Sequence, residues 1–117
     1  SGFYSRRYLV KRYEMIKDKR RFNYIIRNGH YNKDRNFVIY YVPSEDGKIH
    51  YGIAIKNSLG HAVVRNRLKR QTRSIMDNNK NLFKKENDYI IMIRNGCLGG
   101  NFSEMNESLT KLLKGIK

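Results

Sequence analysis

One long amphipathic segment constrains the fold of this chain more than any other feature. At about 100° per residue, Val64, Leu68 and Ile75 fall on one side of a helix that runs from Gly60 to about Asn78. The opposite side forms an arc without acidic residues, which consists of Asn66, Lys69, Arg70 and Arg73, with Arg65 on its flank. Such a helix buries its apolar side against another element. We therefore expect the basic arc to face outward and to be available for binding.

The charge of the chain is high for its size and is unevenly distributed. Lysine and arginine number 25 against 10 acidic residues, which gives a formal net charge of +15 over 117 residues. The window from Gly47 to Met76 contains basic residues and no acidic one. Like charges four residues apart lower the stability of a helix, and a polyanionic partner removes that repulsion. Because the planar fork of arginine suits phosphate groups, the pattern predicts a nucleic-acid-binding protein.

Composition excludes several classes of protein. No apolar run is long enough to span a membrane, and the first residues lack the apolar segment of a signal peptide. Cys97 is the only cysteine, which excludes an intrachain disulfide and a cysteine-based zinc site. We therefore expect no membrane association and a reducing, cytoplasmic setting. The length predicts a single domain, which we place at residues 17–117, after a basic N-terminal arm over residues 1–16.

The remaining pattern predicts a small α+β sandwich with the element order α-β-β-α-β-α around one central sheet. Residues 37–42 are β-branched and aromatic, and residues 49–55 alternate with a period of two, as strands do. The turn chemistry of residues 43–47 makes these two strands antiparallel. Tyr40 and Tyr51 on them offer faces for stacking unpaired bases, which favours RNA. The other predicted elements are a helix between Asp18 and Gly29, a buried strand over 89–93 and a helix from Ser103.

The long helix also carries a family signature. The segment from Gly60 to Arg73, Gly-His-Ala-Val-Val-Arg-Asn-Arg-Leu-Lys-Arg-Gln-Thr-Arg, closely resembles the pattern Gly-Asn-Ala-Val-x-Arg-Asn-Arg-x-Lys-Arg-x-x-Arg of bacterial ribonuclease P protein components. Residues 22–40 are similar to the first helix and strand of that family, and residues 88–94 to a later strand. The resemblance covers about residues 13–115. His61 and Ser74 depart from the pattern, since asparagine and an acidic residue are usual there.

The resemblance implies a fold and a function. The fold is an α/β sandwich with a left-handed βαβ crossover, although such crossovers are right-handed as a rule. The family protein is a subunit of the endoribonuclease ribonuclease P, and it binds the catalytic RNA that removes the 5′ leader of precursor tRNA with Mg2+ ions. The catalytic centre lies in the RNA. We therefore expect no catalytic residue in this chain, no cleavage by the protein alone and no need for a protein oligomer. The family also has metal-binding positions, which we do not transfer to residues of this chain.

Two sets of residues carry over from the family by matching position. The family protein contacts the single-stranded leader in a central cleft between a helix and the sheet. The resemblance implies a leader-binding cleft that contains Phe22, Ile26, Tyr40, Lys69, Arg70 and Arg73. It implies further RNA contacts from Lys56, Arg65, Asn66, Arg67, Lys69, Arg70 and Arg73. Ile26 stands at a cleft position that is often aromatic, which weakens stacking there.

Three other functions compete with this interpretation. A ribosomal or other structural RNA-binding protein without a role in tRNA processing fits the composition equally well, and only the signature segment argues against it. An independent protein nuclease needs a general acid and base, or carboxylates that hold a metal, whereas His30, His50 and His61 lie in different elements. A helix-turn-helix DNA reader is disfavoured because the long helix follows a strand.

Overall fold

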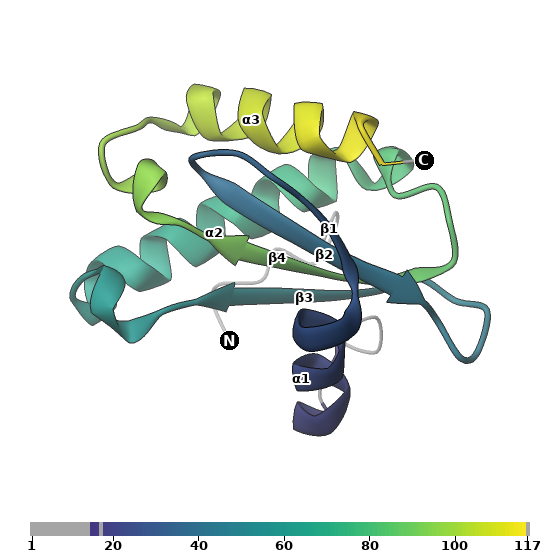
Figure 1. The fold of residues 1–117 in the computed structure, drawn as a ribbon. Helices are drawn as coiled ribbons and strands as arrows, with labels where there is room; N and C mark the ends of the chain where they lie inside the picture. The colour runs from purple at the N-terminus through teal and green to yellow at the C-terminus, as the bar shows by residue number, and fades with distance from the viewer. Residues whose placement is uncertain (1–14, 17, 117) are drawn as a thin grey trace.

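The computed structural model describes residues 15, 16 and 18–116. Within them the chain forms three α-helices packed on one four-stranded sheet (Figure 1). The helices are α1 (Lys19–Asn28), α2 (Ala62–Asn78) and α3 (Phe102–Lys114), and the strands are β1 (His30–Lys33), β2 (Phe37–Pro43), β3 (His50–Ile55) and β4 (Asn87–Ile93). In this described part, every helix is too short or too polar to serve as a membrane span.

The strand order in the sheet is β1-β2-β4-β3. β4 is central, pairing antiparallel with β2 and parallel with β3. Because helices cover it from both faces, its residues 89–91 are buried, and residues 89–93 form an uninterrupted apolar run. β2 and β3 run in opposite directions, as predicted. They are not neighbours, however, because β4 lies between them.

The structure contains one strand that the sequence pattern does not predict. β1 pairs antiparallel with β2 at the edge of the sheet, and its sequence His-Tyr-Asn-Lys is mostly exposed. An edge strand with few buried side chains lacks the apolar alternation that identifies a strand in a sequence. The element order is therefore α-β-β-β-α-β-α rather than α-β-β-α-β-α.

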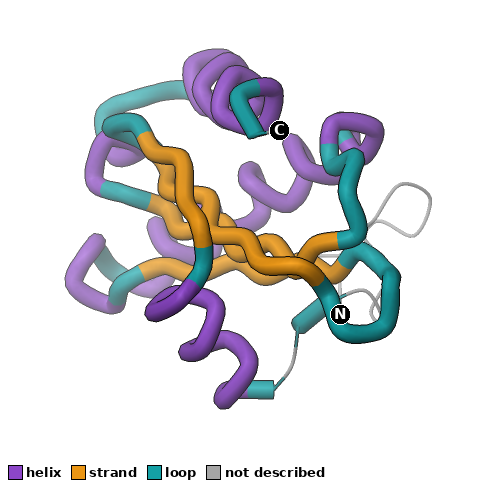
Figure 2. Tube along the Cα trace, turned by 45° about the vertical axis from the view of Figure 1, so that its right-hand side comes forward, coloured by secondary structure: helices purple, strands orange, loops and turns teal. Residues whose placement is uncertain are grey.

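The connection from β3 through α2 to β4 joins two parallel neighbours. It forms the left-handed crossover that the family resemblance implies, with α2 behind the sheet in the view of Figure 1. As a consequence, α2 and α3 share one face of the sheet, while α1 lies on the other face (Figures 1 and 2).

The two faces of the sheet hold separate core clusters. The larger cluster joins α2 and α3 to the sheet and includes Leu68, Ile75 and Leu109, which are all buried. The smaller cluster consists of Ile25, Val42 and Ile90, with Phe22, Ile26 and Tyr40 packed against it. Of the described elements, only α1 covers this second face.

Helix ends follow the capping chemistry of the sequence. The side chain of Asp18 accepts a hydrogen bond from the backbone N–H of Arg20 (2.9 Å) and begins α1, as predicted. Gly29 ends that helix, where an added Cβ would lie 2.5 Å from the carbonyl oxygen of Ile25. The last helix begins one residue before the predicted Ser103. Its start is fixed by a capping box between Asn101 and Glu104.

The predicted boundary between arm and domain falls inside the packed structure. Met15 forms a parallel bridge with Tyr51, and the backbone N–H of Ile16 donates to the carbonyl oxygen of Tyr51 (2.7 Å). Both side chains are half-buried against the core clusters. The rest of the predicted arm, residues 1–14, lies outside the described residues.

Candidate nucleic-acid interface

A groove lies on the face of the sheet that α1 covers only in part. Its volume is about 480 Å³. Val38 of β2 and Met92 of β4 are cross-strand partners in its lining. Basic side chains surround this floor, and they belong to Lys33, Lys56 and Arg94. An apolar floor beside basic side chains suits a strand of nucleic acid whose bases are unpaired.

Tyr40 connects the groove to α1. Its side chain packs with Phe22 and Ile26 of α1 against the smaller core cluster, and it also lines the groove. Gly52 of β3 lies beneath the ring of Phe22, where an added Cβ would come within 3.0 Å of that ring. The structure therefore brings together the three apolar residues expected in the leader-binding cleft.

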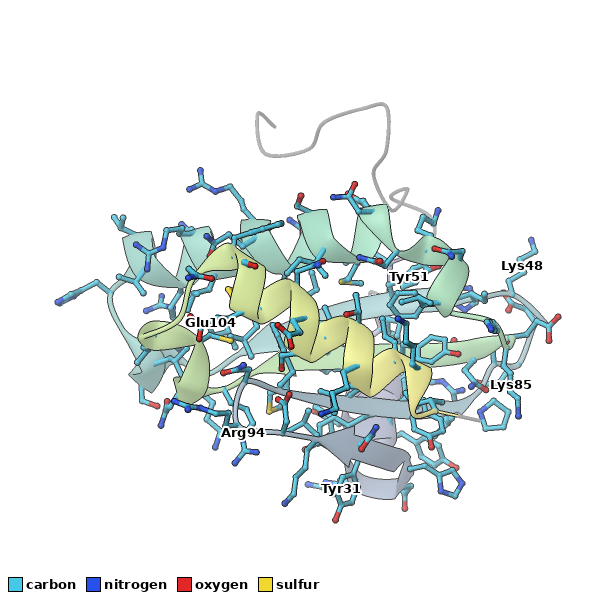
Figure 3. All side chains as sticks on the ribbon, turned by 90° about the horizontal axis from the view of Figure 1, so that it is seen from above. Tyr31, Lys48, Tyr51, Lys85, Arg94 and Glu104 are labelled. Carbon is cyan, nitrogen blue, oxygen red and sulfur yellow. The ribbon has the colours of Figure 1, made fainter. Side chains whose placement is uncertain are left out.

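The basic residues of α2 do not join this groove. Among the described residues that line it, none comes from α2, because α2 packs on the opposite face of the sheet. In Figure 3, Tyr31 and Arg94 lie at the edge of the picture opposite α2, with the strands between them and that helix. Lys69, Arg70 and Arg73 therefore do not line the groove beside Tyr40. Their contact with the leader, together with Phe22 and Ile26, stays a prediction from the family resemblance. The left-handed crossover decides the face on which α2 lies, and the helix pattern carries no information about it.

Arg73 also differs from its predicted orientation. It is only 9% exposed, whereas the helical pattern predicted that it faces outward. Thr72 and Met76 beside it are fully buried, so the buried side of α2 is wider than the arc marked by its aliphatic residues. Lys69 is half-buried at the margin of the same side.

The outward side of α2 carries Asn66, Arg67 and Arg70, which are all exposed, and we refer to these three residues as the α2 surface. Arg65 is half-buried beside it, and its Nη1 donates to the carbonyl oxygen of Gly60 (2.7 Å). That hydrogen bond fixes the loop before α2. The protein thus presents two basic regions, the groove and the α2 surface, on opposite faces of the sheet.

A polar network that the sequence does not reveal attaches α1 to the sheet. Asp88 of β4 is nearly buried, and its carboxylate accepts a hydrogen bond from Nε of Arg21 (2.8 Å) and contacts Nδ1 of His50 (2.7 Å). Nη2 of Arg21 also donates to the carbonyl oxygen of Pro43 (3.0 Å). Arg21 and Asp88 lie 67 positions apart in the chain, so no local pattern predicts their contact.

The described residues contain no metal-binding cluster, and Cys97 lies in the core. No cluster of three or more histidine, cysteine, aspartate or glutamate side chains there can hold a metal ion. Cys97 is buried, and burial raises the pKa of its thiol to about 11. Its Sγ lies 3.2 Å from the carbonyl oxygen of Asn36, to which it donates. These features describe a packed, protonated thiol.

Comparisons with known proteins agree with this architecture. The family model described as Ribonuclease P matches residues 10–117. The chain is 36% identical over 109 residues to the ribonuclease P protein component of Mycoplasma mycoides, covering 92% of this chain and 100% of that protein. It is 29% identical over 109 residues to the corresponding protein of Shouchella clausii, covering 92% and 89%.

Solved structures give the same result. The RNase P protein from Thermotoga maritima matches with a TM-score of 0.79 and 29% sequence identity, covering 89% of this chain and 98% of that one. The RNase P protein of Staphylococcus aureus matches with a TM-score of 0.79 and 29% identity, covering 86% and 93%.

Proposed function

This chain belongs to the ribonuclease P protein family, the protein components of a ribonucleoprotein endoribonuclease, and on that basis we propose that its groove holds the single-stranded 5′ leader of precursor tRNA. Its partner is the RNA subunit of the enzyme. We further propose that the catalytic centre lies in that RNA, that the enzyme acts in the cytoplasm and that its reaction removes the leader.

The composition of the groove is the observation that carries this proposal. Val38 and Met92 form an apolar floor, and the ring of Tyr40 lies beside them. Unpaired bases expose apolar faces that stack on aromatic rings, whereas the bases of a duplex are already stacked on each other. Lys56 and Arg94 can then neutralise the phosphates of the same strand. A single strand therefore fits this groove better than a duplex.

The α2 surface fits a different RNA partner. Arg67 and Arg70 are exposed there with Asn66, and these side chains donate hydrogen bonds to phosphate oxygens and sugars. We assign this surface to the backbone of the RNA subunit. Because the groove lies on the other face of the sheet, one protein molecule can contact the RNA subunit and the leader at the same time.

Magnesium ions enter the proposal as ions held mainly by the RNA. The described residues offer no carboxylate cluster that fits such an ion, so we derive no step through a protein-bound metal. The protein's own residues contribute by binding. The groove orients the leader, and the α2 surface attaches the protein to the RNA. The alternative of a structural RNA-binding protein without a role in tRNA processing has no support from the family match.

The experiment compares precursor tRNA with mature tRNA on the reconstituted holoenzyme. Lys56→Ala removes an exposed groove cation, and we expect the affinity for precursor tRNA to fall roughly tenfold, the loss of one charge-assisted contact. The affinity for mature tRNA, which has no leader, stays unchanged. Lys84→Ala serves as the control because Lys84 is exposed outside the groove. Equal losses for the two tRNAs contradict the assignment of the leader to the groove.

A further inference from the structure

We propose that Tyr31 and Lys33 of the edge strand β1 form a second nucleotide subsite of the groove, which takes one unpaired leader nucleotide in addition to the one on Tyr40. The inference rests on the proposed function. It extends the groove onto the strand that the sequence pattern did not predict. In this subsite the ring of Tyr31 stacks on a base and the ammonium group of Lys33 meets a phosphate.

The alternation of β1 directs these two side chains into the groove. His30 and Asn32 point to the other face of the sheet, where the ring of His30 lies 5.6 Å from that of Tyr41. Nδ2 of Asn32 donates to the carbonyl oxygen of Leu112 in α3 (3.0 Å). Successive side chains of a strand point to opposite faces, so anchoring Asn32 on α3 leaves Tyr31 and Lys33 on the groove side, where both line it.

The rings of Tyr31 and Tyr40 lie side by side on adjacent strands. The two residues are cross-strand partners, and their ring centroids are 6.2 Å apart with a tilt of 50°. Rings that are tilted in this way cannot enclose one base between parallel faces, so each ring offers its own face to a separate base. The Tyr31 side has room for a base because the residue is 59% exposed.

Lys33 supplies the charge that a stacked nucleotide needs. Its Nζ lies 5.7 Å from the centroid of the Tyr31 ring, a cation–π distance that keeps the ammonium group beside the ring. A second cation lies near the end of β1, because Nη1 of Arg94 donates to the carbonyl oxygen of Asp34 (2.6 Å), the residue that follows Lys33. A stacking ring with cations beside it is the arrangement with which proteins bind single strands.

Tyr24 shows what separates this subsite from an ordinary surface tyrosine. Tyr24 is 51% exposed, and the guanidinium of Arg21 lies 5.4 Å from its ring centroid, so its exposure and its neighbouring cation resemble those of Tyr31. Tyr24 does not line the groove, however, among the described residues that do. It is therefore a matched control for the loss of an exposed tyrosine.

The test measures the affinity of the reconstituted holoenzyme for precursor tRNAs whose leaders increase in length from one nucleotide. For long leaders, Tyr31→Ala is expected to lower the affinity roughly 5- to 150-fold, the range for losing one base–aromatic stack. For the one-nucleotide leader it has no effect. Tyr31→Phe keeps the ring and restores wild-type affinity, and Tyr24→Ala binds every substrate like the wild type. Lys33→Ala removes about one phosphate contact, so the slope of the logarithm of affinity against the logarithm of salt concentration becomes shallower by roughly 0.7.

The outcomes separate this inference from the proposed function. If Lys56→Ala weakens binding of long leaders and Tyr31→Ala does not, the subsite is wrong and the groove assignment stands. If the loss of affinity in both variants is the same for every leader length, the proposed function itself fails. If Tyr31→Ala weakens binding of mature tRNA equally, the ring contacts another part of the complex and the subsite is overturned. Thermal melts of Tyr31→Ala and Tyr24→Ala should coincide, because both side chains are exposed.

Discussion

The two faces of the sheet use neighbouring residues of the same strands for opposite purposes. In β2, Ile39 is buried in the core beneath α2 and α3, whereas Val38 and Tyr40 line the groove on the other face. The helices α2 and α3 cover one face, and α1 covers one end of the other face. The incomplete cover of the second face leaves the groove open, while the cover of the first face by two helices supplies most of the core.

The largest expected effect comes from the core beneath α2. Leu68 is 1% exposed, and Leu68→Ala should lower the free energy of unfolding by about 2–5 kcal/mol, as truncation of a buried leucine does. A denaturant titration measures this loss. RNA affinity should remain near that of the wild type under conditions where the variant is folded. A stable variant that fails to bind RNA would show that Leu68 belongs to the binding surface.

The network at Asp88 should connect stability to the groove. Asp88→Ala leaves Arg21 and His50 without their shared carboxylate. We expect the free energy of unfolding to fall by about 2 kcal/mol, because both partners reach solvent and escape the full penalty of a buried unpaired charge. Since this network attaches α1 to the sheet, leader affinity should also fall. Glu45→Ala is the control: Glu45 contacts the same arginine at 3.4 Å from an exposed position, and its loss should change little. Unchanged leader affinity in Asp88→Ala would mean that α1 does not shape the groove.

Arg70→Ala tests whether the two basic regions act separately. Its stability should match that of the wild type or rise slightly, because repulsion between like charges on the helix is relieved. Affinity for the RNA subunit should fall by about 1–3 kcal/mol if Arg70 makes a charge-assisted contact. The difference in affinity between precursor and mature tRNA should not change. Binding titrations with each RNA check both statements, and a loss confined to the leader would place Arg70 in the groove after all.

The smallest effect concerns the thiol of Cys97. Burial raises its pKa to about 11, above the ordinary value of 9.0, so the folded state favours the protonated thiol. The contribution of the protonated thiol to the free energy of unfolding is complete below about pH 9 and is lost as the pH rises through 11. At neutral pH a thiol reagent should react with Cys97 only after denaturant is added. Rapid reaction of the native protein would show that this part of the core opens readily.

Much of the local structure follows from the sequence itself. The capping chemistry of Asp18 and the stop at Gly29 delimit α1, and the apolar run of β4 predicts a buried strand. These features depend on interactions within a few residues, which a single sequence contains. The signature from Gly60 to Arg73 identifies the family on the same grounds, since it is one continuous segment of α2 and the loop before it.

What the sequence could not determine depends on contacts between distant segments. The insertion of β4 between β2 and β3 and the pairing of β1 with β2 arise from hydrogen bonds across the sheet. Helical periodicity gives the direction of the apolar side of α2. The width of its buried side, and hence the burial of Arg73, depends on what packs against it. The hand of the crossover then places the α2 surface and the groove on opposite faces, because it selects the face of the sheet that α2 covers.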